Sequence, residues 1–201
     1  MFLALLRRGL LPDRGRLLDL GCGQGVLLAL LAAAADQYER GQWPTGWPPP
    51  PRNLLLHGFE FRADRVITAR RALAGRATIA LCDVRSADFP ASPVVVLFDV
   101  LMYLERPEQE RVLEKAAAAV EPGGTLLLRE TDAGGGLAFQ MSRWSERLLQ
   151  AGRGRLRDPL CYRSAMDWTR LLGGLHFSVT AEPMDAGTPF ANVLFVARKG
   201  A

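Results

Sequence analysis

The chain has 201 residues, of which 49% are hydrophobic and 23% are charged. This length and composition fit one folded domain and exclude a chain that is disordered throughout. The net charge is +4, but no run of basic residues exceeds two, which argues against a nucleic-acid-binding tail.

The cysteines and the apolar runs indicate the cellular compartment in which we expect the protein. Cys22, Cys82 and Cys161 are odd in number and have no metal-ligand spacing, so we expect a reducing environment and no metal site. Residues 1–8 lack the charged-then-apolar order of a secretion signal, and no run reaches the roughly 18 apolar residues of a membrane span. We therefore expect a cytoplasmic protein.

Short apolar runs alternate with longer helical stretches from residue 16 onward. Residues 94–98 are apolar throughout, which is typical of a parallel strand covered on both faces. The expected strands span residues 16–20, 53–60, 77–82, 93–98 and 125–129, and the expected helices span residues 26–37, 63–74 and 108–120. This alternation predicts right-handed crossovers and a doubly wound α/β sheet.

The rhythm changes near the end of the chain. Residues 176–181 and 193–198 are expected strands, and the connection between them contains Pro183, Gly187 and Pro189. Because that connection has no room for a crossover helix, the last two strands should be antiparallel neighbours.

Two segments interrupt the alternation. Residues 37–52 contain two tryptophans and a run of four prolines, which predicts an irregular surface insertion. Residues 132–174 are too long for a simple crossover, and we expect them to form a substrate cap.

A glycine-rich turn follows the first expected strand. Asp19 precedes Gly21, Gly23 and Gly25, directly before an expected helix. Glycines let the backbone approach a ligand closely, and the helix N-terminus favours an anionic group. Ligands of such sheets bind beyond the carboxyl ends of the strands, where the winding direction reverses.

Residues 18–25, Leu-Asp-Leu-Gly-Cys-Gly-Gln-Gly, resemble motif I of class I S-adenosylmethionine-dependent methyltransferases. In that family the loop holds the amino-acid part of the cofactor. Glu60 resembles the acidic residue that binds the ribose, and Asp83 with Val84 resembles the adenine-contacting motif. Residues 97–104 and 121–128 resemble the motifs that follow. The resemblance implies S-adenosyl-L-methionine bound by Asp19, Gly21, Cys22, Gly23, Gln24, Gly25, Glu60, Phe61, Asp83, Val84, Asp99 and Val100.

The same resemblance implies an architecture. It is a Rossmann-like, doubly wound, mostly parallel sheet of seven strands in the order 3-2-1-4-5-7-6, with strand 7 antiparallel. Residues 1–201 would form a single class I methyltransferase domain. A nucleotide-dependent oxidoreductase is the main competitor, but its third glycine would be misplaced here, and Glu60 lies 35 positions after Gly25 rather than about 20.

Candidate catalytic residues follow the fourth and fifth strands. Methyl transfer needs alignment with the sulfonium, and a general base only where the nucleophile must lose a proton. Many small-molecule relatives place a His where this chain has Met102, so the candidates are Tyr103, Glu130 and Asp132, for which loop capping is an equal alternative.

The expected cap supplies candidates for the substrate side: Tyr103, Met141, Trp144 and Trp168. Phe139, Met141, Trp144 and Leu148 form an apolar stripe at helical spacing, which fits either core packing or a pocket for an aromatic or polyene acceptor. Nearby arginines fit either a solvated face or attraction of an acidic acyl carrier protein. They are Arg143, Arg147, Arg153, Arg155, Arg157 and Arg163.

A second resemblance concerns mainly residues 183–193, together with Trp168 and residues 124–129 and 132–134. These are similar to small methyltransferases of bacterial aryl polyene pigment pathways. That resemblance implies secondary metabolism and an aromatic acceptor, with an acyl carrier protein as its optional carrier. A non-catalytic cofactor-binding scaffold and an RNA methyltransferase stay open as alternatives, although no added RNA-binding module is present.

Overall fold

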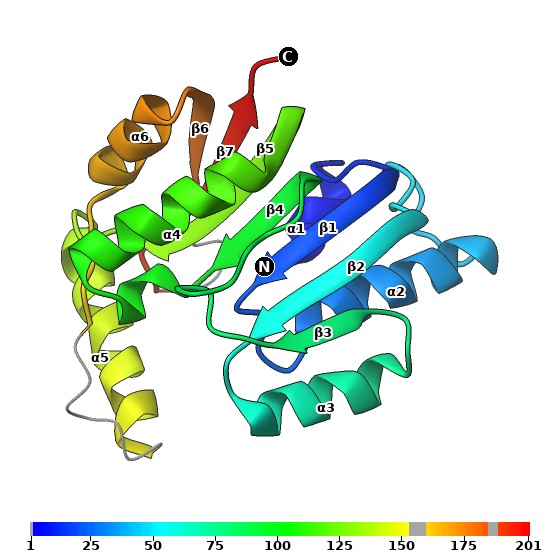
Figure 1. Ribbon diagram of the computed structural model, residues 1–201, viewed down its shortest axis with the longest axis horizontal. Coiled ribbons are helices and arrows are strands. Elements are labelled where there is room, and N and C mark those ends of the chain that lie inside the picture. The colour runs from blue at the N-terminus through cyan, green and yellow to red at the C-terminus, as the bar shows by residue number, and fades with distance from the viewer. Residues whose placement is uncertain (1, 153–159, 185–188) are drawn as a thin grey trace.

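The structure is a computed structural model that describes residues 2–152, 160–184 and 189–201. Seven strands form one sheet in the order β3-β2-β1-β4-β5-β7-β6 (Figure 1). β7 is antiparallel to both β5 and β6, and the other pairs are parallel, which confirms the expected order. The strands are β1 (Arg14–Leu20), β2 (Asn53–Glu60), β3 (Thr78–Leu81), β4 (Ser92–Phe98), β5 (Val120–Thr131), β6 (Phe177–Pro183) and β7 (Asn192–Lys199).

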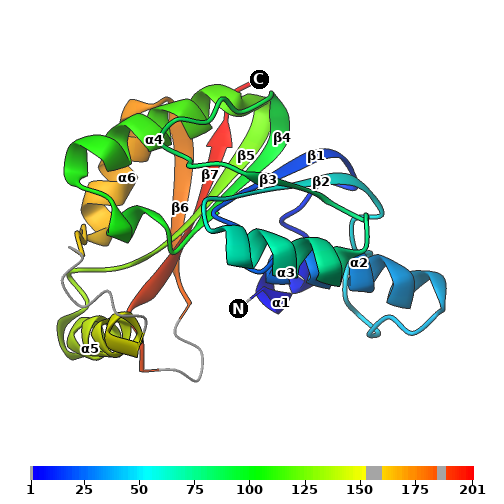
Figure 2. The ribbon, with the colours of Figure 1, turned by 60° about the horizontal axis from the view of Figure 1, so that its bottom comes forward.

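Helices cover both faces of the sheet (Figure 2). α1 (Leu3–Arg7), α2 (Val26–Glu39) and α3 (Ala63–Leu73) lie on one face, and α4 (Arg106–Ala119) and α6 (Ala165–Gly174) lie on the other. Successive side chains of a strand point to opposite faces. Leu17 accordingly joins the core under α1–α3 and Leu18 joins the core under α4 and α6. Both cores make the central strands fully buried, as the continuous apolar run predicted.

Residues 132–174, which we expect to form a cap, do not lie together in the structure. Among those of them that the structure describes, only α5 (Gly136–Gly152) lies beyond the carboxyl ends of the parallel strands, apart from the sheet (Figures 1 and 2). A role of this segment as a cap stays a prediction. α6 instead packs on the sheet as the crossover helix between β5 and β6, because Trp168 and Leu172 are fully buried in its core. A capping box between Ser164 and Asp167 begins this helix.

The expected insertion starts later than predicted, because α2 continues to Glu39. The irregular stretch after it packs Trp43 and Trp47 against the core, and the Trp43 indole donates a hydrogen bond to the Pro48 carbonyl at 2.9 Å. These tryptophans therefore have a structural role. No helix in the described part of the chain is long and apolar enough to cross a membrane.

Candidate functional site

The glycine loop links the end of β1 to α2 in a conformation that requires glycine. Gly21, Gly23 and Gly25 have φ angles of 85°, 57° and 77°, in the left-handed region. A Cβ on Gly21 would lie 2.3 Å from the Val100 Cγ2 atom. The N–H groups of Gly21 and Cys22 both donate to the Phe59 carbonyl, so β2 fixes the start of the loop.

A cavity of about 360 Å³ lies over this loop. It is lined by Phe2, Asp19, Gly21, Cys22, Gly23, Gln24, Val26, Leu27, Arg65, Phe98 and Asp99. The structure thus brings together six of the residues that the sequence assigned to the cofactor: Asp19, Gly21, Cys22, Gly23, Gln24 and Asp99. Val100, also assigned to the cofactor, does not line this cavity. Gly25 stands behind them as the N-cap of α2. The cavity is large enough for a cofactor-sized ligand.

Asp19 is the most unusual group in the cavity. Asp19 is 5% exposed, and none of the described residues donates a hydrogen bond to its carboxylate. Burial, and then the charge of Glu60, raises the pKa of Asp19 to about 7. A buried carboxyl group without a donor is costly unless a ligand supplies one, so Asp19 fits an ammonium group.

Glu60 lies beside the loop but does not line the cavity. One carboxylate oxygen accepts from the Gly23 N–H at 3.0 Å and the other from the Arg62 N–H at 2.8 Å. Glu60 is 3% exposed, and Arg65 places a guanidinium nitrogen 3.9 Å from it. The structure therefore shows Glu60 holding the loop to the start of α3, and its contact with a ribose stays a prediction.

These features fit a zwitterionic amino-acid group, which carries both an ammonium group and a carboxylate. The N–H groups of the first turn of α2 have no acceptors within the helix, and that end carries partial positive charge. Val26 and Leu27 of this turn line the cavity together with Asp19. A carboxylate at α2 and an ammonium group at Asp19 would satisfy both ends of the site.

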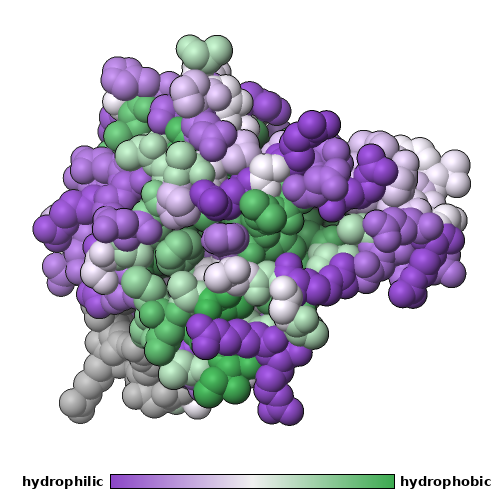
Figure 3. Space-filling view, turned by 45° about the vertical axis from the view of Figure 1, so that its right-hand side comes forward, coloured by the Kyte–Doolittle hydropathy of each residue, from purple (hydrophilic) through white to green (hydrophobic). Residues whose placement is uncertain are grey.

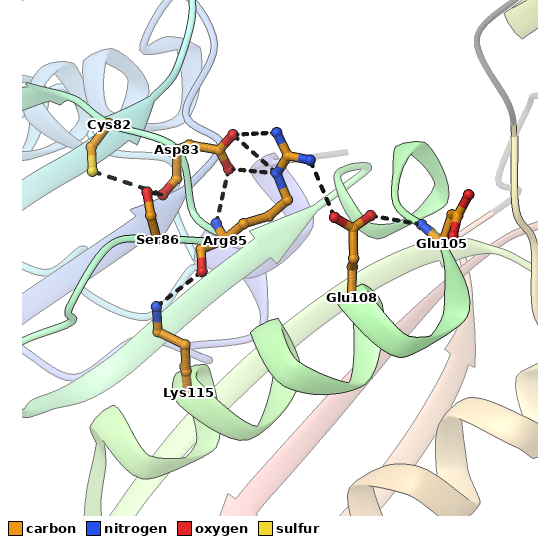
Figure 4. A network of polar contacts seen from close by, with 7 residues as sticks. All are labelled: Cys82, Asp83, Arg85, Ser86, Glu105, Glu108 and Lys115. Atoms are coloured by element: carbon orange, nitrogen blue, oxygen red, sulfur yellow. Dashed lines mark hydrogen bonds and ion pairs between the residues drawn. The ribbon is translucent and has the colours of Figure 1, made fainter.

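Asp83, which follows β3, forms an ion pair with Arg85. Arg85 binds its carboxylate through both guanidinium and backbone nitrogens and also reaches Glu108 on α4 at 3.2 Å (Figure 4). This arginine lowers the pKa of Asp83, which stays ionised. Val84 is buried in the core under α4, and Phe61 is 55% exposed. Neither Asp83, Val84 nor Phe61 lines the cavity over the loop, so their contact with adenine stays a prediction.

Asp99 follows β4 and reaches the same cavity. It adopts a φ angle of 56°, and Arg129 of β5 donates to its carboxylate at 2.6 Å. Burial raises the pKa of Asp99 to about 6; Arg129 opposes this shift and the charge of Glu146 adds to it. A residue of α5 thus lies close enough to influence the site at the end of β4.

Tyr103 and Glu146 form the link between the strand ends and α5. Tyr103 lies in the short 3-10 helix η1 (Leu101–Tyr103) after β4, and its hydroxyl donates to the Glu146 carboxylate at 2.6 Å. Tyr103 is 39% exposed. A phenol hydrogen-bonded to a carboxylate can pass a proton to it.

Glu130 and Asp132 hold backbone rather than facing the cavity. Glu130 is 2% exposed and accepts from the Leu101 N–H at 2.8 Å, and burial raises its pKa to about 8. Asp132 accepts from the Gly134 and Ala165 N–H groups, both at 2.8 Å. Among the described residues, no cluster of three or more His, Cys, Asp or Glu could hold a metal ion.

The substrate-binding candidates from the expected cap include both buried and exposed side chains. Trp168 lies in the core, where Arg163 stacks over its ring, and does not face a cavity. Met141 and Trp144 are exposed on α5, and Trp144 lines a second cavity. Arg163 is 6% exposed and binds Gln109 and Glu110 of α4, whereas Arg153, Arg155 and Arg157 lie outside the described residues.

Sequence reasoning missed Phe2, Arg65, Glu146 and Tyr162. Phe2 stacks on Phe98 with ring centroids 6.2 Å apart and so closes one side of the cofactor cavity. Glu146 carries no local signal, because its partner lies 43 residues away in the chain. Only the placement of α5 brings the two together.

The sequence profile of a family described as a methyltransferase domain matches residues 2–182. The chain belongs to this methyltransferase family. The match confirms the expected class I S-adenosylmethionine-dependent methyltransferase and, with it, S-adenosyl-L-methionine as the cofactor. The resemblance to aryl polyene methyltransferases receives no support from the relatives described next.

Three relatives place this methyltransferase among known proteins. Carboxy-S-adenosyl-L-methionine synthase of Chromohalobacter salexigens is 30% identical over 117 residues, which are 56% of this chain and 38% of that protein. A methyltransferase structure from Methanosarcina mazei has a TM-score of 0.66 at 15% identity and covers 96% of both chains. Magnesium protoporphyrin IX methyltransferase from Synechocystis with bound S-adenosylhomocysteine has a TM-score of 0.67 at 19% identity, covering 99% of this chain and 80% of that one.

The structural likeness shows the fold, which confirms the Rossmann-like sheet. The chain spans 38% of the synthase and 51% of an O-methyltransferase family protein from Burkholderia thailandensis, which has a TM-score of 0.67 at 18% identity and covers 92% of this chain. The reactions of these longer proteins are therefore not assigned to this chain.

Proposed function

We propose that the protein transfers a methyl group from S-adenosylmethionine to a small-molecule acceptor. The observation that carries this proposal is the cavity over the glycine loop, where a buried carboxylate without a donor faces the N-terminus of α2. S-adenosylmethionine supplies the methyl group, already activated on a positively charged sulfur. Asp19 would hold its ammonium group and α2 its carboxylate.

The residues at the strand ends would then orient the acceptor and remove its proton. In the overall step an acceptor oxygen–methyl bond forms as the sulfur–methyl bond breaks, and the acceptor proton must leave. Tyr103 is placed to take up that proton as its own hydroxyl proton passes to the Glu146 carboxylate, to which the hydroxyl donates at 2.6 Å. General-base assistance of this kind contributes roughly 10²- to 10⁴-fold.

The residue roles in this proposal differ from those predicted from the sequence. Tyr103 and Glu146 act together, whereas Glu130 and Asp132 support the backbone around them. The carrier-protein partner and the cytoplasmic location stay predictions. Burial of Arg163 removes one arginine from the set that would attract a carrier protein.

Two measurements test the proposal. Calorimetry should show binding of S-adenosylhomocysteine, and labelled S-adenosylmethionine should yield a methylated product with aromatic hydroxy compounds as acceptors. Tyr103→Phe and Glu146→Gln should lower kcat at least tenfold and leave the affinity for S-adenosylhomocysteine unchanged. Tyr38→Phe is the matched control, because Tyr38 packs against Trp43 away from the cavity.

The outcomes separate the alternatives. Binding without turnover on any acceptor would favour the scaffold, and strongly salt-dependent binding of RNA would favour an RNA methyltransferase. No binding of S-adenosylhomocysteine would refute the proposal altogether.

A further inference from the structure

A second cavity, of about 540 Å³, lies against α5 and shares no lining residue with the cofactor cavity. It is lined by Phe139, Arg143, Trp144, Arg147, Leu148, Ala151, Leu160 and Tyr162. Its size matches that of small-molecule sites in proteins. The activity proposed above leaves this cavity without an assigned ligand.

Aromatic and aliphatic side chains form the walls of the cavity. The rings of Phe139 and Tyr162 meet edge to face with centroids 5.2 Å apart. Trp144 is 69% exposed and Leu148 is 61% exposed, although both are large apolar residues. The face of the molecule shown in Figure 3, on which no residue of this cavity is marked, likewise has hydrophobic side chains at the surface with hydrophilic ones among them. Flat apolar walls of this kind fit a planar ring.

The charged lining is entirely cationic among the described residues. Arg143 and Arg147 are four positions apart on α5, which places them on one face of the helix. Arg143 makes no hydrogen bond or ion pair with any other described residue, whereas Arg147 donates to Gln150 at 3.2 Å. The nearby carboxylate of Glu146 is engaged by Tyr103. Guanidinium groups in such a setting favour a carboxylate, which they bind in a bidentate manner.

Tyr162 adds a third donor. Its hydroxyl oxygen is buried and has no hydrogen-bond partner in the described structure. Burial raises the pKa of Tyr162 to about 12, so the hydroxyl keeps its proton at neutral pH. A buried donor without an acceptor is unfavourable, and an anionic oxygen of a ligand would satisfy it.

The cavity adjoins the segment that follows β4, because Cys161, between the lining residues Leu160 and Tyr162, donates its N–H to the Met102 carbonyl at 2.8 Å. The charges of Glu146 and Glu130 both act on Tyr162, and Glu146 also acts on Asp99 in the cofactor cavity. The hydrogen bond between Tyr103 and Glu146 connects α5 with the exit of β4. A ligand in this cavity would therefore lie next to the groups proposed to receive the acceptor proton.

We propose that this second cavity binds the methyl acceptor, and that the acceptor is a planar aromatic compound that carries a carboxylate. Arg143, Arg147 and Tyr162 bind the carboxylate, and the ring lies against Trp144 and Phe139. This inference rests on the proposed methyl transfer and names its class of substrate. A neutral acyl thioester on a carrier protein would leave the three donors without an anion.

Calorimetry with a matched pair of compounds tests the proposal. The probes are 6-hydroxy-2-naphthoate and its neutral amide, 6-hydroxy-2-naphthamide, titrated into the full chain with and without S-adenosylhomocysteine. The acid should bind at least tenfold more tightly than the amide. Arg143→Gln combined with Arg147→Gln should remove this preference, whereas Arg71→Gln should keep it, because Arg71 is an exposed arginine of α3 outside both cavities.

Equal affinity for acid and amide, no binding of either, or a preference that persists in the double variant would each overturn the proposal. Circular dichroism of the double variant checks that it is folded. Failure of the cofactor site is recognised separately, because Asp19→Asn should weaken S-adenosylhomocysteine binding and leave the acid-over-amide preference intact.

Discussion

Replacing Asp19 with asparagine should make the ligand-free protein more stable at alkaline pH and weaken its cofactor site. The folded protein raises the pKa of this carboxyl from 3.8 to about 7, chiefly through burial. A raised pKa means that the folded state holds the proton more tightly than the unfolded state. The free energy of unfolding of the wild type is therefore highest, as far as Asp19 determines it, at about pH 4, and it falls as the pH rises toward about 7.

The magnitude follows from the same values. A pKa increase from 3.8 to about 7 corresponds to about 4 kcal/mol at a pH above both values, at ~1.36 kcal/mol per pH unit. Asp19→Asn keeps the shape of the side chain and removes the charge. The variant should gain up to about 4 kcal/mol of unfolding free energy at pH 8 and little at pH 4.

Binding should change in the opposite direction. The ionised carboxylate is the form that attracts an ammonium group, so wild-type affinity for S-adenosylhomocysteine should increase as the pH rises through about 7. A hydrogen bond to a charged group contributes about 1.5–3 kcal/mol, so the variant should bind roughly 10- to 100-fold more weakly at pH 8. Its affinity should also lose this pH dependence.

Urea unfolding and calorimetry at pH 5 and pH 8 measure both effects. Asp36→Asn is the matched control, because Asp36 is paired with Arg76 at the surface and its pKa is lowered. A variant of Asp19 that is less stable than wild type at pH 8, or that binds S-adenosylhomocysteine equally well, would refute the reasoning.

Three further substitutions have defined outcomes. Gly21→Ala should weaken S-adenosylhomocysteine binding more than tenfold, because φ is 85° and the new Cβ would lie 2.3 Å from Val100; Gly41→Ala, at a φ of 70° with open space around it, should retain wild-type affinity in calorimetry. Glu130→Gln should match wild type in thermal melting at pH 4 and exceed it at pH 9, because the buried carboxyl costs wild-type stability progressively as the pH rises from its ordinary pKa of 4.5 to its raised pKa of about 8. A lower melting temperature of the variant at both pH values would contradict this. Arg163→Ala should lower the unfolding free energy by about 1–3 kcal/mol, because it leaves the buried Gln109 amide oxygen without its donor. An unchanged urea midpoint would show that this side chain is not structural.

The sheet could be predicted from the sequence because its signals are local. Continuous apolar runs identify strands buried on both faces, and the glycine turn after residue 20 identifies the point where the winding direction reverses. Asp19 and Asp99 reach one cavity because they lie at the carboxyl ends of neighbouring parallel strands.

The sequence could not show which helix after β5 packs on the sheet, because α5 and α6 are both amphipathic. Only α6 of these two helices packs there. The Ser164–Asp167 capping box was a usable signal for the start of α6. The pairings of Glu60 with Gly23 and of Tyr103 with Glu146 depend on distances through space, and no spacing along the chain indicates them.

The segment that carries α5 is fixed at both ends. Asp132 and Ala133 bond to the Ala191 and Arg163 carbonyl groups before it, and Cys161 bonds to the Met102 carbonyl after it. α5 contributes one hydrogen bond to these anchors, from the Ala191 N–H to the Ser142 hydroxyl at 3.0 Å, and no residue to the lining of the cofactor cavity. A protein built in this way can change its acceptor through substitutions on one helix, provided that Ser142 and Glu146 of that helix are kept.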